Sequence, residues 1–231
     1  MGKLSIVATP IGNLGDLTFR ALWNLKECSV IYAEDTRVTL KLLNHYGLRK
    51  PIFRLDAATE STKTAEVIER LEKGEHVVYV TDAGTPGVSD PGARLVSLVR
   101  EELPEVKIEA VPGPSALTAA LSIAGVNADQ FTFLGFLPHK KGRQTMLKEI
   151  AQMVRPGSPQ AEIPVVLYES PHRIVKLLKG LEIFVPKCSV TIARELTKVH
   201  EEILSGPPRE LANILEKGKK VRGEFVVIIS H

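Results

Sequence analysis

The chain has 231 residues and a net charge of +3, with 25% charged and 5% aromatic residues. This length can bury a sizeable core or form two domains, and the near-average composition excludes a disordered chain or a disulfide scaffold. Cys28 and Cys188 stand far apart without Cys or His partners at metal spacing, so we expect a reducing compartment and no metal. No apolar run suits a signal peptide or membrane span, so we expect a soluble cytoplasmic protein with no membrane partner.

Short apolar runs alternate with segments of helical periodicity along most of the chain. This alternation is typical of βαβ units and predicts a largely parallel sheet. The predicted strands of the first half are residues 4–8, 30–33, 52–55, 77–80 and 108–111, and the predicted helices are 17–26, 39–46, 62–72 and 93–102. Trp23 lies on the apolar period of the first helix with Phe19, which predicts a core position.

The second half repeats this style. Its predicted strands are residues 131–136, 165–168, 189–193, 201–204 and 225–229, and its predicted helices are 115–123, 143–154, 172–178 and 208–217. A Pro-Gly-Pro segment at 112–114 and a change of composition after it predict a domain boundary there, although composition alone would also allow a boundary near Gly125. We therefore expect an α/β fold with two α/β lobes, an N-terminal lobe of residues 1–112 and a C-terminal lobe of residues 113–231.

Two turn-rich segments, TDAGTPGVSDPG at 81–92 and PGPSA at 112–116, follow apolar strands. Small ligands bind beyond the carboxyl ends of strands in open α/β sheets, where glycines let the backbone come close. These segments predict a small polar ligand that is held largely by backbone groups. The first loop, ATPIGNLGD at 8–16, does not have the spacing of a dinucleotide fingerprint, and its alternative interpretation is a turn in which Asp16 caps the next helix.

A series of short motifs runs through the chain in one order. They are TPIGNLGD (9–16), AEDTR (33–37), LLNHYG (42–47), TDAGTPGVSDPG (81–92), PGPSA (112–116), GFLP (135–138), YESPHR (168–173), ARELTK (193–198) and GEFVVI (223–228). Together they resemble the ribosomal RNA small subunit methyltransferase I family, cytidine ribose 2′-O-methyltransferases of the tetrapyrrole methylase superfamily. The departures, Thr81 before DAGTP and Val199-His200 after ARELTK, do not affect residues on which the interpretation depends.

The resemblance implies a class III methyltransferase that binds S-adenosyl-L-methionine in a cleft between two α/β lobes, usually as a homodimer. Carried over by motif position, the expected cofactor-binding residues are Ile11, Asp82, Ala83, Gly84, Thr85, Val88, Ser115, Ala116, Leu134, Tyr168, Arg194 and Glu195. Simpler roles also suit some of them. Asp82 could cap its own turn, Ser115 could cap a helix, and Arg194 could pair with Glu195.

The implied reaction is an in-line transfer of a methyl group from a sulfonium to a ribose hydroxyl, which depends mainly on positioning. A base or a cation near the nucleophile would help. The candidates at strand ends and nearby are Glu34, Asp35, Arg37, Arg20 and Lys198, and no general base is singled out. The acidic and basic residues of EDTR could equally form a cluster that orders the loop.

A basic loop directly after GFLP contains His139, Lys140, Lys141 and Arg143. Such loops are commonly solvated surface, but beside a methyltransferase cleft they predict contacts with RNA phosphates. The partner that the resemblance implies is small-subunit ribosomal RNA, free or in the assembled 30S subunit. Two alternatives remain open: a methyltransferase for a tetrapyrrole or another small molecule, and a non-catalytic module that binds nucleotides or RNA.

Overall fold

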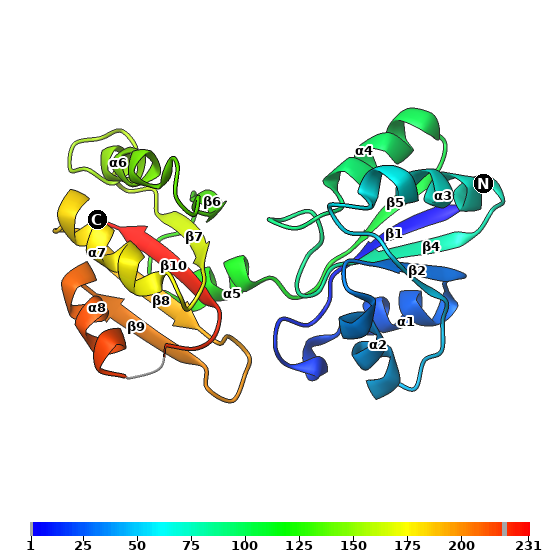
Figure 1. The fold of residues 1–231 in the computed structure, drawn as a ribbon, viewed down its shortest axis with the longest axis horizontal. Helices are drawn as coiled ribbons and strands as arrows, with labels where there is room; N and C mark the ends of the chain where they lie inside the picture. The colour runs from blue at the N-terminus through cyan, green and yellow to red at the C-terminus, as the bar shows by residue number, and fades with distance from the viewer. Residues whose placement is uncertain (1, 219–220) are drawn as a thin grey trace. The chain divides into compact units, whose positions relative to one another are not determined.

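A computed structural model describes residues 2–218 and 221–231 (Figure 1). The chain divides into two compact units, which we call unit 1 (residues 1–115) and unit 2 (residues 116–231). Each has its own sheet, which confirms the predicted α/β class with two sheets. The Pro-Gly-Pro-Ser segment at 112–115 ends unit 1.

Unit 1 is built around a parallel sheet with the strand order β3-β2-β4-β1-β5. The strands are β1 (Lys3–Val7), β2 (Val30–Ala33), β3 (Ile52–Arg54), β4 (His76–Val80) and β5 (Lys107–Val111). The helices are a short 3-10 helix η1 (Leu14–Asp16), α1 (Phe19–Glu27), α2 (Thr36–His45), α3 (Glu60–Glu72) and α4 (Ala93–Glu102). Figure 1 shows α3 and α4 on one face of this sheet and α1 and α2 on the other.

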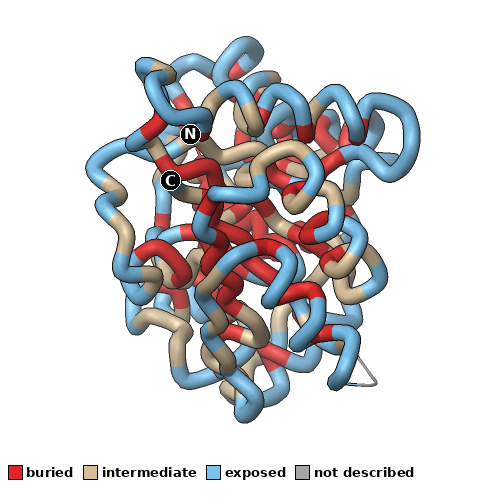
Figure 2. The backbone as a smooth tube through the Cα atoms, turned by 90° about the vertical axis from the view of Figure 1, so that its left-hand side faces the viewer, coloured by how far each residue is buried: buried red, intermediate tan, exposed pale blue. Residues whose placement is uncertain are grey.

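Helices on both faces explain why the strands of unit 1 read as continuous apolar runs. All four residues of β2 are buried, and its neighbour β4 is buried over Val77–Val80. Figure 2 marks such buried stretches in red and exposed turns in pale blue. Because all neighbouring strands are parallel, the segments that follow β1, β2, β4 and β5 emerge at the same edge of the sheet.

The first helix corrects two predictions. Thr18, and not Asp16, caps α1, since its hydroxyl accepts a hydrogen bond from the backbone nitrogen of Ala21 (3.1 Å). The prediction that Trp23 lies in the core is wrong, because its exposed fraction is 62% and that of Phe19 is 94%. The buried stripe of α1 runs instead through Ala21, Asn24 and Leu25. Small and polar residues on this stripe leave little apolar signal, while the aromatic residues form a second, exposed stripe.

Unit 2 has the strand order β6-β7-β10-β8-β9. The strands are β6 (Thr132–Phe136), β7 (Val165–Glu169), β8 (Ser189–Arg194), β9 (Glu202–Gly206) and β10 (Phe225–Ser230). Only the β6–β7 pair is parallel in the described part of this sheet, so the prediction of a largely parallel sheet is wrong for unit 2. Residues of β9 alternate between exposed and half-buried, as expected for an antiparallel edge strand.

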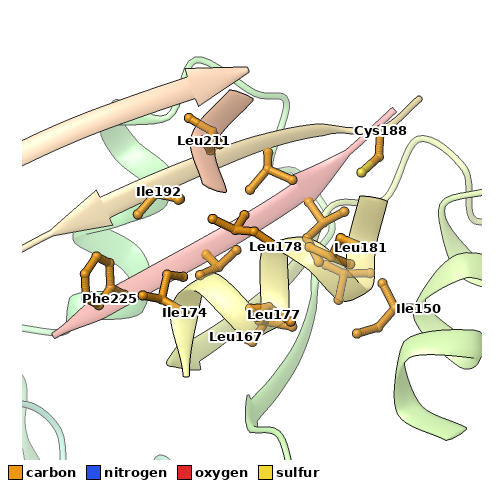
Figure 3. Packing of buried hydrophobic residues seen from close by; sticks show 14 of the residues in the cluster. Ile150, Leu167, Ile174, Leu177, Leu178, Leu181, Cys188, Ile192, Leu211 and Phe225 are labelled. Carbon is orange, nitrogen blue, oxygen red and sulfur yellow. The ribbon is translucent and has the colours of Figure 1, made fainter. Parts of the chain in front are cut away.

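The helices of unit 2 are α5 (Ala116–Ile123), α6 (Arg143–Met153), α7 (Ile174–Phe184) and α8 (Pro208–Lys217). Leucines of α7 form the centre of the apolar core together with β7 and β10 (Figure 3). The helix predicted at 172–178 continues through Gly180 to Phe184. Gly180 allows close packing, since a Cβ atom there would lie 2.7 Å from Cδ1 of Leu147 on α6.

Candidate active site

The loops that follow β1 and β4 are joined by their backbones. The nitrogen of Thr9 donates to the oxygen of Gly84 (2.9 Å), and the nitrogen of Gly84 donates to the oxygen of Thr9 (3.0 Å). The hydroxyl of Thr85 then donates to the oxygen of Pro114 (3.3 Å) in the segment after β5. Three strand-end segments are therefore linked at one edge of the unit 1 sheet.

Gly84 occupies the middle of this linkage with a φ of 79°, a conformation that residues with a side chain rarely adopt. It is buried, and a Cβ atom there would lie 3.5 Å from Cγ2 of Ile11 and 3.7 Å from the oxygen of Pro114. The neighbouring Ala83 is exposed, and Val88 is half-buried. The loop thus presents a small-residue backbone surface, which the sequence motif had predicted for a ligand-binding segment.

Asp82 connects this loop to the segment after β2. Its Oδ1 accepts a hydrogen bond from the backbone nitrogen of Asp35 (3.0 Å), and its own nitrogen donates to Oε2 of Glu34 (3.4 Å). The contact to Asp35 is between segments, so Asp82 does more than close its own turn. It brings Glu34, Asp35 and Asp82 together at the edge where Ile11 and Gly84 also lie.

The carboxylates here titrate differently from one another. Burial and the charges of Glu34 and Asp82 raise the pKa of Asp90 to about 6. Burial also raises the pKa of Glu34 and that of Asp82, with a contribution from neighbouring carboxylates. Hydrogen bonds from Arg37 instead lower the pKa of Asp35 to about 2. The edge therefore holds a group of carboxylates that a nearby positive charge would stabilise in their ionised form.

Arg37 and Arg20 were both candidates as catalytic cations. Arg37 donates from Nη2 to Oδ2 of Asp35 (2.5 Å), and its side chain is 86% exposed. Arg20 is exposed on α1. Arg37 therefore lies beside the carboxylate group, and the structure gives no comparable contact for Arg20 among the described residues.

In unit 2, Leu134 and Tyr168 occupy the neighbouring strands β6 and β7 and are half-buried. The ring of Tyr168 contacts Phe133 (centroids 5.0 Å apart) and Phe136 (5.5 Å). The β6–β7 register shifts between Phe133 and Phe136, where Gly135 has a φ of 60°. This irregularity lets Phe133 and Phe136 both reach Tyr168. Ala116 begins α5.

The segment that begins at the end of β8 forms a network of ion pairs, which does not include the predicted pair of Arg194 and Glu195. Arg194 pairs with Glu202 (3.2 Å), whereas Glu195 pairs with Lys198 (2.9 Å), so the expected Arg194–Glu195 pair is wrong. Burial opposes the charge of Lys198, but hydrogen bonds to Glu195 and Glu224 outweigh it and raise the pKa of the amine. Lys198 is consequently a cation and an unsuitable base.

The basic loop after β6 exposes three of its four predicted RNA-binding residues, His139, Lys140 and Lys141. Arg143 is different, because it begins α6, is 5% exposed and donates from Nη2 to Oε2 of the buried Glu169 (2.8 Å). Its placement on the exposed basic surface is therefore corrected. The helical start at Arg143 turns the side chain inward, which a loop-like run of charges does not reveal.

Sequence reasoning missed two residues of these sites, Asp90 and Glu169. Asp90 lies near the end of the motif TDAGTPGVSDPG and follows Ser89, whose φ of 62° is unusual for a residue with a side chain. Glu169 sits between Tyr168 and Ser170 in YESPHR and is 1% exposed. In both cases the sequence signal was an acidic residue within a motif that follows or ends a buried strand. A buried carboxylate at such a position needs an ion-pair or hydrogen-bond partner.

Three further features concern metal ligands, thiol groups and membrane spans. Within residues 2–218 and 221–231, no group of three or more His, Cys, Asp or Glu side chains is placed to hold a metal. Burial raises the pKa of Cys28 and that of Cys188 to about 11, so neither is a reactive thiolate at neutral pH. None of the helices in these ranges has the length and apolar composition of a membrane span.

A mainly apolar cavity of about 310 Å³ lies elsewhere in unit 2, lined by Phe184, Cys188 and His231 among others. Cys188 precedes β8 and His231 follows β10, whereas Tyr168 and Arg194 are near the opposite ends of β7 and β8. The cavity therefore lies away from the predicted binding residues of unit 2.

Comparisons with known proteins agree with this arrangement. The profile of a family described as tetrapyrrole (corrin/porphyrin) methylases matches residues 3–212. Ribosomal RNA small subunit methyltransferase I of Thermotoga maritima is 41% identical over 230 residues, covering 100% of this chain and 99% of that protein. The chain belongs to the ribosomal RNA small subunit methyltransferase I family. Membership of this family makes it a methyltransferase.

Solved structures of tetrapyrrole methylases share the fold. Cobalt precorrin-4 methyltransferase, a cobalamin biosynthetic enzyme, gives a TM-score of 0.71 at 17% identity, over 99% of this chain and 94% of that one. Uroporphyrin-III C-methyltransferase from Thermus thermophilus, in complex with S-adenyl homocysteine, gives 0.64 at 20% identity, over 100% and 98%. At these identities the likeness concerns the fold, while the ribosomal RNA small subunit methyltransferase I relatives carry the closer relationship.

Proposed function

We propose that the protein transfers a methyl group from S-adenosyl-L-methionine to the ribose 2′-hydroxyl of a cytidine in small-subunit ribosomal RNA. The observation that carries the proposal is the 41% identity to ribosomal RNA small subunit methyltransferase I over the full length of both chains. The motifs that support the family assignment also supply the linked strand-end loops of unit 1. A cytoplasmic location accords with a ribosomal RNA substrate.

The chemistry of the unit 1 edge suits this cofactor. S-adenosyl-L-methionine supplies an activated methyl group on a sulfonium and carries a second positive charge on its ammonium. Glu34, Asp82 and Asp90 form a carboxylate group with raised pKa values, and a bound cation would relieve their mutual repulsion. Gly84 holds the loop against Thr9, and the neighbouring Ala83 is exposed and offers backbone groups to the polar ends of such a ligand.

We assign the cofactor contacts in unit 1 to Ile11, Asp82, Ala83, Gly84, Thr85, Val88 and Ser115. In unit 2 the family motifs support contacts from Ala116, Leu134, Tyr168, Arg194 and Glu195. The ion pairs of Arg194 and Glu195 serve mainly to hold the segment after β8 in place.

For the reaction, a ribose hydroxyl must lose its proton as the new bond forms. Glu34 suits a general base better than Asp35, because the raised pKa of Glu34 gives its carboxylate a higher affinity for a proton. Arg37 keeps its charge and is exposed beside Asp35, so it suits stabilisation of the developing negative charge on the oxygen. Positioning of the nucleophile supplies the remaining acceleration.

The RNA is proposed to contact the exposed residues His139, Lys140 and Lys141. Phosphate groups are the same in every RNA sequence, so we expect these side chains to contribute affinity rather than sequence specificity.

We also propose that the protein forms a homodimer. The exposed aromatic stripe of α1, Phe19 and Trp23, supports an apolar interface with a second copy. Trp23 is the single tryptophan of the chain, so its fluorescence reports on this surface. Dilution through the dissociation range should shift its emission to longer wavelength, and light scattering that finds a monomer at all concentrations would contradict the dimer.

A methyl-transfer assay tests the proposed function. Tritiated S-adenosyl-L-methionine is offered with intact 30S subunits, naked ribosomal RNA and a porphyrinogen in parallel. We expect label in RNA alone, at a cytidine ribose. Label in the porphyrinogen would support the small-molecule alternative, and cofactor binding without transfer to any acceptor would support a non-catalytic module.

A further inference from the structure

A buried ion cluster lies at the carboxyl end of β7. Glu169 is the last residue of this strand, and its side chain is fully buried. Arg143, at the start of α6, approaches one carboxylate oxygen (Nη2 to Oε2, 2.8 Å), and Arg173, just before α7, approaches the other (Nε to Oε1, 2.9 Å). The start of α6 and the segment from Glu169 to Arg173 therefore meet at one carboxylate.

The cluster is unusual because it has two guanidinium groups for one carboxylate. Nε and Nη1 of Arg143 are buried and have no hydrogen-bond partner in the described part of the chain. Buried donors without partners oppose folding, and apolar residues of similar volume often replace buried ion pairs without loss of stability. The cluster therefore calls for an explanation other than stability, and its contacts with the neighbouring loop supply one.

Both ends of the basic loop are fixed to this cluster. At the start of the loop, Nη1 of Arg173 donates to the backbone oxygen of Leu137 (3.1 Å). At the end of the loop, Arg143 directly follows Gly142, whose φ is 89°, and pairs with Glu169. Between these two points the exposed residues His139, Lys140 and Lys141 face solvent. Glu169 thus holds two arginines that fix the loop on either side.

The second arginine is itself held by further contacts. Nε of Arg173 donates to the hydroxyl of Ser170 (3.0 Å), and its guanidinium lies 6.0 Å from the ring centre of Phe136. The backbone nitrogen of Ser170 donates to Oε1 of Glu169 (2.9 Å). These contacts leave the Arg173 side chain little freedom, so the carbonyl of Leu137 has a well-defined donor.

We propose that Arg143, Glu169 and Arg173 are positioning residues that hold the loop of His139, Lys140 and Lys141 in the conformation that binds RNA phosphates. This inference rests on the proposed function, because it concerns the same RNA contact. A loop already fixed in its bound conformation loses less conformational freedom when RNA binds. In this proposal the cluster acts through His139, Lys140 and Lys141 and does not itself contact RNA.

Arg173→Lys tests the inference most directly. Lysine keeps the positive charge, but a single ammonium cannot reproduce the planar set of contacts to Glu169, Ser170 and Leu137. We expect about a tenfold rise in the dissociation constant for 30S subunits or ribosomal RNA, from the added cost of ordering the loop. Affinity for S-adenosyl-L-methionine, measured by calorimetry, should not change. Arg209→Lys, on an exposed ion pair with Glu182, is the matched control.

A double-mutant cycle separates positioning from general weakening. In a background of His139→Ala, Lys140→Ala and Lys141→Ala, Arg173→Lys should change RNA affinity by less than about twofold, because the side chains through which it acts are gone. Equal losses in both backgrounds would overturn the inference. Hydrogen exchange at the amides of residues 139–142 should be faster in Arg173→Lys, and unchanged exchange would also overturn the inference.

Ser170→Ala serves as a milder second variant if Arg173→Lys does not fold, since it removes one hydrogen bond from Arg173 and leaves every charge in place. Ser170→Ala should also weaken RNA binding and speed hydrogen exchange in the loop, but by less than Arg173→Lys does. The absence of both effects would contradict the inference. If the wild-type protein binds no RNA, the proposed function fails. If the wild type binds RNA and the cycle is additive, the positioning inference alone fails.

Discussion

We expect Asp90→Asn to stabilise the folded protein and to weaken the binding of the cofactor. Asp90 lies in the loop between β4 and α4, and burial together with the charges of Glu34 and Asp82 raises its pKa from 3.8 to about 6. The folded state therefore disfavours the ionised form. Stability is greatest below the ordinary pKa of the group, falls as the pH rises through about 6, and stays lower above it.

The size of this effect follows from the two pKa values. A tenfold change in proton affinity corresponds to about 1.4 kcal/mol, so the rise from 3.8 to about 6 sets an upper bound of about 3 kcal/mol. Asp90 is half-buried, and solvent screening reduces the figure to about 1 to 2 kcal/mol. Asp90→Asn should raise the free energy of unfolding by this amount at pH 7.5 and change it little at pH 4.

The same substitution should weaken cofactor binding, although it stabilises the folded protein. If the cationic cofactor needs ionised Asp90, wild-type affinity should fall about tenfold between pH 7 and pH 5, because roughly one molecule in ten is ionised one pH unit below the pKa. Asp90→Asn should bind more weakly at pH 7.5 and lose most of this pH dependence. Calorimetry from pH 5 to 8 measures affinity, and urea unfolding measures stability.

Asp129→Asn, on an exposed loop of unit 2, is the matched control and should change neither quantity. If Asp90→Asn stabilises the protein but leaves affinity and its pH dependence unchanged, the raised pKa has no connection with the cofactor. If it destabilises the protein at pH 7.5, the electrostatic reasoning itself is wrong.

Three further changes have defined outcomes. Gly92→Ala should lower the free energy of unfolding, measured in urea, by about 2 to 4 kcal/mol, because its φ is 117° and the new Cβ would lie 2.6 Å from Cε1 of Tyr79. Gly47→Ala should lower it by only about 1 to 2 kcal/mol, because its φ is 67° and no described atom lies within 4 Å of the new Cβ. Equal losses in the two variants would contradict this prediction. Asp82→Ala should weaken the binding of S-adenosyl-L-methionine by about 1 to 3 kcal/mol, as measured by calorimetry. A lower melting temperature with unchanged affinity would restrict Asp82 to a structural role. Lys140→Ala with Lys141→Ala should reduce the salt dependence of RNA binding by about one unit of slope for each lost phosphate contact, and full activity at physiological salt would place the RNA elsewhere.

The sequence predicted the strands of both units well, because most are short and strongly apolar. β2 matches its predicted range of 30–33, and α4 and α8 match 93–102 and 208–217. Strand direction in unit 2 could not be predicted in the same way. A buried run such as β10 reads alike in parallel and antiparallel sheets, since burial on both faces removes the alternation of polar and apolar residues.

For the candidate site, the sequence likewise predicted some features and not others. The linkage of the segments after β1, β4 and β5 was foreseeable from the small-residue motifs, because parallel strands bring their carboxyl ends to one edge. Side-chain direction was not foreseeable. Arg143 reads as part of a basic loop but turns inward to Glu169, and Trp23 reads as core but is exposed, because each depends on which face of a helix meets the sheet.

Transfer of a labelled methyl group to an RNA substrate tests whether the protein methylates a ribose 2′-hydroxyl. The assay uses tritiated S-adenosyl-L-methionine and two matched RNA substrates, one with cytidine and one with 2′-deoxycytidine at the target position, and it follows both binding and product. We expect that both substrates bind, that the cytidine substrate is methylated at its 2′-oxygen, and that the deoxy substrate is inert. Methylation of the deoxy substrate at its base would show that the ribose 2′-hydroxyl is not the methyl acceptor.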